Sequence, residues 1–266
     1  MDLFGRGYSD CPDLPHDSRL YSTQILLAIT SSPLPWTPEG FSIIGYSLGG
    51  GIAVDFAVYF PSIVQSLVLL APGGLIRTHH FGWQSRLLYS DWVPDIVVSN
   101  IVQRRLQGAS ISKSNSKSKQ ETGNGGAAEQ AVSAEIKGNR DPDFESAPLS
   151  RSRPGITVAS VVQWQVDNHE GFVSSFISSI KHASIGGQKE TWQRLRKRSD
   201  KVLIVVGKTD TVIVEAELRE DVFDAVGEDK VEWRTIEAGH EFPMTKSDEV
   251  VDIISNAWGL AVSKVE

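Results

Sequence analysis

The chain has 266 residues, of which 40% are hydrophobic and 22% charged, and its formal net charge is −7. Such a composition is typical of a globular chain with one main domain and an elaboration, and the negative charge argues against nucleic acid as a partner. Cys11 is the single cysteine, so no internal disulfide can form, which suits a reducing, cytoplasmic compartment. Since no apolar run approaches the roughly 20 residues of a spanning helix, we expect no membrane span, and no leader peptide is visible.

Helices and strands are predicted to alternate over the first 70 residues. A helix is expected over Asp17–Ile29, with Asp17 as its cap and three prolines closing it. The apolar run Phe41–Ile44 is predicted to be a strand, and Gly49–Phe60 the helix that follows it. This alternation favours an α/β fold with a mostly parallel sheet.

The most informative motif is the pentad Gly45-Tyr46-Ser47-Leu48-Gly49, between the predicted strand and the helix. A turn this tight asks for small residues on both sides of the serine. It lifts the Ser47 hydroxyl clear of the sheet and aims the Leu48 amide at the same spot, which suits nucleophilic acyl chemistry. Tyr46 adjoins the serine and is a candidate for the substrate pocket. A serine in such a turn can also simply cap the helix, so the pentad alone leaves both interpretations open.

The middle of the chain interrupts this alternation, from about residue 72 to residue 200. Residues 108–155 are rich in Ser, Lys and Gly and hold few aliphatic side chains. Such a segment cannot bury enough apolar surface to offset its ordering entropy, so it is predicted to be disordered. Its basic Ser/Lys run at 112–119 is either a solvated linker or a targeting or phosphorylation site.

Order is predicted to resume at Ile156. Apolar residues recur at three- and four-residue steps over Val158–Ile180, which indicates helix that Gly171 breaks or kinks. His169 and Phe172 lie on this apolar stripe. Each either lines a substrate pocket or packs in a core, and these alternatives stay open at the sequence level.

Two further strands are predicted near the end of the chain, each followed by a polar residue of interest. The aliphatic run Val202–Val206 is typical of a strand buried on both faces, and Asp210 lies in the loop after it. Val231–Ile236 is the second strand, and His240 lies in the loop after that. Taken singly, Asp210 could be a turn or cap aspartate and His240 a surface histidine.

The three polar residues form a pattern because each follows a predicted strand, in the chain order Ser47, Asp210, His240. In this order the serine is the nucleophile, the histidine the general base, and the aspartate orients the imidazole. The Leu48 amide would help to hold the oxyanion. The sequence therefore predicts a catalytic triad for acyl transfer to water.

These motifs resemble those of the α/β-hydrolase superfamily over nearly the whole chain apart from the central insert. Asp2–Asp10 is similar to the family's glycine-bearing loop after its fourth strand, and Gly45–Gly49 to its nucleophile elbow. Ser66–Pro72 is similar to the family's next strand and the exit towards its cap domain. A serine at the elbow, rather than an aspartate, implies hydrolysis of an ester, thioester, amide or carbon–carbon bond. The resemblance implies a core in two parts, residues 1–75 and 201–266, with a helical cap at 76–200 between them.

The resemblance also implies a departure at the front. In the family, four strands, a helix and a His-Gly loop that supplies the first oxyanion amide precede the segment matching Asp2–Asp10. We therefore expect this chain to be truncated on its N-terminal side, with Phe41–Ile44 as an uncovered apolar edge and the oxyanion hole half built. That would weaken its activity or abolish it.

The sequence thus predicts a serine hydrolase of a small-molecule acyl substrate. An acyltransferase on the same scaffold and a catalytically impaired fragment are the alternatives. No cofactor is implied, and the histidines show no metal-ligand spacing, so no metal site is predicted. Oligomeric state and the identity of the substrate are beyond the sequence.

Overall fold

The structure is a computed structural model. It describes residues 1–77, 98–100, 102–103, 148–150 and 152–260. The chain divides into two compact units. Unit 1 comprises Met1–Tyr21 and Arg77–Ala183, and unit 2 comprises Ser22–Ile76 and Ser184–Glu266. Residues 1–21 belong to unit 1 and residues 184–200 to unit 2, while the division into a two-part core and a helical cap stays a prediction.

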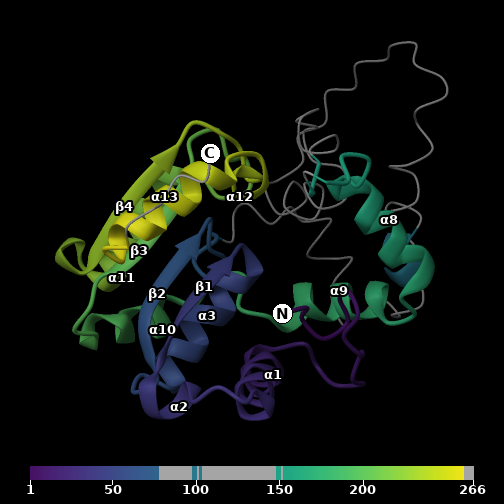
Figure 1. Ribbon diagram of the computed structural model, residues 1–266, viewed down its shortest axis with the longest axis horizontal. Helices are drawn as coiled ribbons and strands as arrows, with labels where there is room; N and C mark the ends of the chain where they lie inside the picture. The colour runs from purple at the N-terminus through teal and green to yellow at the C-terminus, as the bar shows by residue number, and fades with distance from the viewer. Residues whose placement is uncertain (78–97, 101, 104–147, 151, 261–266) are drawn as a thin grey trace. The chain divides into compact units, whose positions relative to one another are not determined.

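Unit 2 is built on a parallel sheet, which has four strands within the described residues. In Figure 1 they lie side by side in chain order: β1 (Phe41–Tyr46), β2 (Val64–Leu70), β3 (Val202–Gly207) and β4 (Val231–Ile236). Every residue of β3 is buried, as its unbroken aliphatic sequence predicts. The four predicted strands are thus confirmed, and the real ones differ by at most two residues at either end.

The first strand lies at the edge of this sheet among the described residues. The side chains of residues 41–44 are half-buried or exposed, and Ile44 is 48% exposed. The expectation of an apolar edge at residues 41–44 is therefore met within the part of the chain that the structure describes.

The helices of unit 2 pack against the sheet and against one another. Helix α3 (Leu48–Tyr59) packs on β1 and β2, and nine of its twelve residues are buried, because its glycines and alanines let it approach closely. The others are α2 (Trp36–Glu39), α10 (Lys189–Gln193), α11 (Glu215–Val226), α12 (Phe242–Thr245) and α13 (Ser247–Ala257), with 3₁₀ turns at Arg194–Lys197 and Glu228–Lys230. Helix α1 (Ser18–Ser31) begins at the end of unit 1 and continues into unit 2, and Asp17 accepts hydrogen bonds from its first amides as predicted.

Two helices dominate the described part of unit 1. Helix α8 (Val158–Asn168) starts with a capping box between Thr157 and Ser160, and α9 (Phe172–His182) follows it. The predicted helical stripe is confirmed, and so is the break, which falls at residues 169–171 just before α9. Phe172 and Phe176 of α9 form a buried cluster with Val98, Val102 and Ile177.

Residues at the very start of the chain belong to unit 1 because they bind α9. The Arg6 guanidinium lies 5.2 Å from the ring centre of Phe172 and 5.6 Å from that of Phe176, and it donates a hydrogen bond to Ser175. Ser175 Oγ in turn donates to the Gly5 carbonyl at 2.9 Å. No pattern within residues 1–10 announces this pairing, since its partners lie about 170 positions further along.

The predicted disordered segment 108–155 falls on residues outside the described ones as far as residue 147. Its last part is described and makes regular contacts. Pro148 forms an antiparallel bridge with Thr157, and the Leu149 amide donates to the Ile156 carbonyl at 2.8 Å. Residues 148–150 and 152–155 therefore differ from the prediction of disorder, because they pair with the entry into α8.

Within unit 2, the two ends of the excursion through residues 77–183 are joined. Ile76 and Gly186 form a parallel bridge, and the Gly74 amide donates to the Ile185 carbonyl at 2.7 Å. Ser184 donates from its hydroxyl to the carboxyl group of Asp55 on α3, which is 2% exposed. Burial raises the pKa of Asp55, against the opposing effect of the Ser184 hydroxyl.

As for membranes, the described helices include none with the length and apolar character needed to span a bilayer.

Candidate active site

The turn between β1 and α3 holds Ser47 in a rare backbone conformation. Its φ is 52° and its ψ −120°, and φ is positive although the residue is not glycine. The Ser47 amide donates to the Leu70 carbonyl at 2.9 Å, and its carbonyl accepts from the Gly73 and Gly50 amides at 2.8 and 2.9 Å. These bonds hold the strained turn against the end of β2.

Close packing around the turn explains part of its glycine pattern. A Cβ added to Gly45 would lie 2.3 Å from the Gly49 carbonyl oxygen, and one added to Gly50 would lie 2.6 Å from Pro72. A Cβ on Gly49, by contrast, would meet nothing within 4 Å. A side chain at Gly45 or Gly50 would therefore clash with the fold, whereas there is room for a Cβ at Gly49.

Asp210 lies where the sequence predicts, in the loop that follows β3. Its Oδ1 accepts hydrogen bonds from the amides of Val212 and Ile213, both at 2.8 Å, and its Oδ2 lies 2.7 Å from His240 Nδ1. Because both oxygens are engaged and the residue is 7% exposed, the carboxyl group has one fixed orientation. It points at the imidazole.

His240 links the acid to the serine. Its Nδ1 faces Asp210, and its Nε2 lies 3.0 Å from Ser47 Oγ. Since a carboxylate can only accept at Nδ1, that nitrogen carries the proton and Nε2 is left to accept from the hydroxyl. The structure therefore brings the three residues together in one hydrogen-bonded chain, and all three belong to unit 2.

The histidine loop is packed tightly against the end of β3. A Cβ on Gly207 would lie 2.4 Å from the Gly239 carbonyl oxygen, and the Thr209 amide donates to the Ala238 carbonyl at 3.1 Å. Glu241, which is 6% exposed, accepts from the Gly239 amide at 3.2 Å. The close approach of two backbones thus fixes the position of the loop.

The Leu48 amide is the first N–H group of α3, so it has no acceptor within its own helix. It follows Ser47 directly and carries the partial positive charge of the helix N-terminus. The carbonyl oxygen of a group attacked by Ser47 Oγ would therefore lie beside the Leu48 amide as a hydrogen-bond donor.

Tyr46 makes a contact that the sequence did not reveal. Its hydroxyl donates to the carbonyl oxygen of His240 at 2.9 Å, and its ring centre lies 5.1 Å from that of the imidazole, at 35°. Tyr46 is also a predicted candidate for the substrate pocket, and its hydroxyl is bound to the histidine loop. No local signal indicates this, because the two residues are 194 positions apart.

The other two predicted pocket residues, His169 and Phe172, lie in unit 1. Phe172 is 4% exposed and packs in the cluster of α9, the alternative that the sequence left open. His169 is the C-cap residue of α8, and its Nε2 donates to the Ser9 carbonyl at 2.9 Å.

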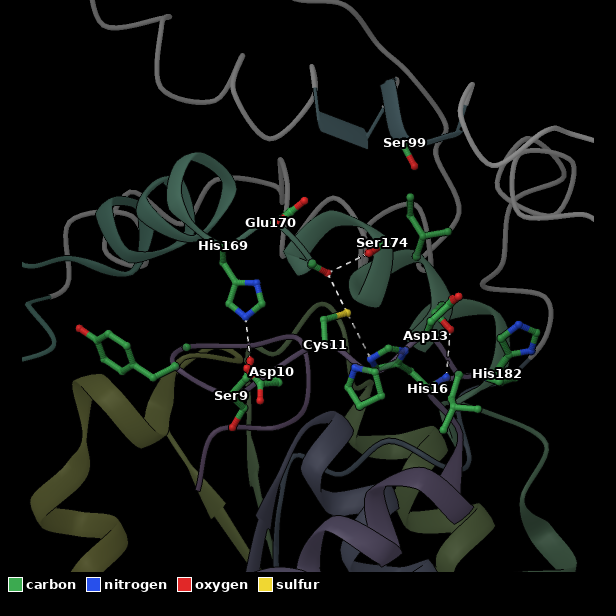
Figure 2. Close-up of a pocket in the computed structure, with 18 of the residues that line it drawn as sticks. Ser9, Asp10, Cys11, Asp13, His16, Ser99, His169, Glu170, Ser174 and His182 are labelled. Carbon is green, nitrogen blue, oxygen red and sulfur yellow. Dashed lines mark hydrogen bonds between the residues drawn. The ribbon is translucent and has the colours of Figure 1, made fainter.

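His169 also lines a cavity of about 1000 Å³ in unit 1, shown in Figure 2. The loop from Gly7 to His16 forms one wall, and the end of α8, one side of α9 and Ser99 line the rest. Figure 2 shows Cys11 in this cavity. Its Sγ lies 3.4 Å from the carbonyl oxygen of Gly171, which lies between α8 and α9, and 3.9 Å from His16 Nε2. Burial, and next the charge of Arg6, lower the pKa of His16.

No cluster of three or more His, Cys, Asp or Glu side chains with metal-binding geometry occurs among the residues that the structure describes. The polar groups around Ser47 are accounted for by hydrogen bonds to one another and to the backbone.

Comparison with known sequences gives a short match only. No family model matches the chain. Uncharacterized proteins of Mycobacterium tuberculosis and Mycobacterium bovis are 36% identical to it over 78 residues. That segment is 29% of this chain and 21% of each relative, so the match spans about a fifth of the relatives' length.

Comparison with solved structures covers almost the whole chain. A meta-cleavage product hydrolase from Pseudomonas fluorescens IP01 is 13% identical, with a TM-score of 0.57, over 97% of this chain and 78% of that one. A 2-hydroxy-6-oxo-6-phenylhexa-2,4-dienoate hydrolase from Rhodococcus sp. strain RHA1 is 16% identical, with a TM-score of 0.58 and coverage of 97% and 78%. The enol-lactonase from Burkholderia xenovorans LB400 is 14% identical, with a TM-score of 0.59 and coverage of 97% and 79%. Together with the parallel sheet and its serine-bearing turn, these similarities confirm that the chain has the α/β-hydrolase fold.

Proposed function

We propose that this protein is a serine hydrolase that cleaves a carboxylic ester or a related small acyl compound through an acyl-enzyme. One observation carries the proposal: an unbroken hydrogen-bonded chain from Asp210 Oδ2 through His240 to Ser47 Oγ, with distances of 2.7 and 3.0 Å. Both distances lie within the range in which a base can take a proton from a nucleophile.

The geometry supports a definite division of roles. His240 Nε2 takes the hydroxyl proton as Ser47 Oγ attacks the substrate carbonyl carbon, and Asp210 stabilises the imidazolium that forms. The Leu48 amide donates to the oxyanion. The leaving group departs with the proton from His240, and a water activated by the same imidazole then hydrolyses the acyl-enzyme.

The packing of the acid supports this assignment over a purely structural one. A turn aspartate needs only the amides of Val212 and Ile213, which Asp210 Oδ1 binds. Its Oδ2 is directed at the histidine instead, so one residue caps its own loop and orients the imidazole. The recurrence of hydrolases among similar structures supports the reaction class as well.

A fluorophosphonate probe tests the proposal, because it reacts covalently with an activated serine. We expect labelling of the wild-type chain at Ser47, found by mass spectrometry of the modified peptide, and none in Ser47→Ala. Ser62→Ala, which removes an exposed serine of the same unit, is the matched control and should label normally. Asp210→Asn should slow labelling on the order of 10³- to 10⁴-fold, because the amide favours the wrong imidazole tautomer.

The same experiment can refute the assignment. Labelling of Ser47→Ala at the wild-type rate would show that another residue reacts. Equal rates for Asp210→Asn and the wild type would show that the hydrogen-bonded chain does not activate the serine.

A further inference from the structure

We infer that Tyr46 is a positioning residue that sets the distance between the base and the nucleophile. This inference rests on the proposed function. The Tyr46 hydroxyl binds the backbone carbonyl oxygen of His240, and the imidazole of that same residue makes both hydrogen bonds of the triad.

The argument begins with how the nucleophile is held. Tyr46 is the last residue of β1 and pairs with Leu70 of β2, and the next amide, that of Ser47, donates to the same Leu70 at 2.9 Å. Tyr46 and Ser47 are therefore two consecutive residues fixed to one point of the sheet. Any group bonded to the Tyr46 side chain is located relative to the serine.

The second step is how the base is held. Backbone contacts fix the histidine loop up to residue 238: the Lys208 amide donates to the Ile236 carbonyl at 2.8 Å, and the Thr209 amide to the Ala238 carbonyl at 3.1 Å. These contacts tie the histidine loop to the loop after β3, which carries the acid. They locate His240 relative to Asp210 and leave its distance from β1 to other contacts.

The Tyr46 side chain supplies such a contact. Its hydroxyl holds the His240 carbonyl at 2.9 Å, and its ring packs beside the imidazole with 5.1 Å between the centres. The phenol thus joins the strand that bears the nucleophile to the backbone of the base. Since a shift of 1 Å at a reacting group can cost about 100-fold in rate, a bond that fixes this separation has a catalytic effect without touching substrate.

The geometry also separates this role from that of a pocket residue. A tyrosine that recognises substrate presents its hydroxyl to the ligand. Here the hydroxyl's proton is directed to the His240 carbonyl. Substrate recognition by Tyr46 is therefore an outcome that the test must be able to detect.

Tyr46→Phe removes the hydroxyl and keeps the ring, and Tyr59→Phe is the matched control, because Tyr59 is 46% exposed at the end of α3. We expect Tyr46→Phe to slow phosphonate labelling of Ser47 about tenfold, with an unchanged unfolding temperature. With an ester substrate, kcat should fall and KM should stay constant. The control should match the wild type in every respect.

A second readout does not depend on activity. The imidazole ¹H and ¹⁵N resonances of His240 report its tautomer and its bond to Asp210, and we expect them to shift or broaden in Tyr46→Phe but not in Tyr59→Phe. If the wild type shows no labelling of Ser47 at all, the proposed function fails, while the spectra still show whether Tyr46 holds the histidine.

Three results would overturn the inference. One is an unchanged labelling rate together with unchanged imidazole resonances. Another is a slower labelling rate accompanied by a lower unfolding temperature, which would indicate a merely structural residue. The third is a rise in KM alone, which would make Tyr46 a substrate contact.

Discussion

Alanine at Gly45 and alanine at Gly49 should have opposite effects, although the two glycines flank the serine symmetrically in the sequence. A Cβ at Gly45 would lie 2.3 Å from the Gly49 carbonyl oxygen, 2.7 Å from its carbonyl carbon and 2.8 Å from Ala53 Cβ. Ordinary contacts of this kind are about 1 Å longer, and two of the three atoms are backbone, so the start of α3 must move. We expect Gly45→Ala to lower the free energy of unfolding of unit 2 by about 1–3 kcal/mol or more.

Gly49→Ala is the matched substitution because a Cβ there meets nothing within 4 Å and the residue lies in the first turn of α3. Alanine should raise stability by up to about 1 kcal/mol through its better helix propensity. Thermal unfolding followed by circular dichroism measures both effects, with about 2–4 °C expected for each kcal/mol. Displacing α3 by 1 Å should also slow phosphonate labelling about 100-fold in Gly45→Ala. Equal stability and equal labelling of the two variants would refute the reasoning.

Two further predictions concern pH. Burial raises the pKa of Asp55, so the folded chain binds more protons than the unfolded one above about pH 4, and stability falls as pH rises towards the folded pKa. Urea unfolding at several pH values should therefore show that Asp55→Asn loses less stability with rising pH than the wild type. Ser184→Ala should lose more, because the Ser184 hydroxyl favours the charged carboxylate of Asp55. Parallel curves of stability against pH for all three chains would contradict this. Burial and the charge of Arg6 lower the pKa of His16, so the unfolded chain binds more protons there and stability falls as pH drops below about 6.5. Hydrogen exchange of α9 amides should show this loss in the wild type and less of it in His16→Gln; the same acid sensitivity in both chains would count against it.

The core of unit 2 could be predicted from sequence because its signals are local. The unbroken aliphatic run Val202–Val206 identifies a buried strand by itself, and a parallel sheet gathers the residues that follow its strands at one edge. That rule places Ser47, Asp210 and His240 near one another. The distances of 2.7 and 3.0 Å agree with it.

What the sequence could not supply depends on contacts between distant segments. The contact between Arg6 and α9 depends on packing of the Arg6 guanidinium on the Phe172 ring, and the residues that it joins are about 170 positions apart. The tie between Tyr46 and His240 has no pattern to announce it. Nor does the pentad show that only one of its glycines, Gly45, is sterically required. These features follow from tertiary packing, which neither periodicity nor turn chemistry encodes.

The bridge between Ile76 and Gly186 closes the chain on itself within unit 2. The bridge and the hydrogen bond from the Gly74 amide to the Ile185 carbonyl both lie within unit 2. These contacts therefore do not depend on the length of the chain between them. Doubling the length of such a loop adds only about 0.6 kcal/mol of closure entropy. The length of the chain between residues 76 and 184 can therefore change while its two ends stay joined within unit 2. Any such change must still leave a partner for Arg6, since the first residues of the chain are bound to α9.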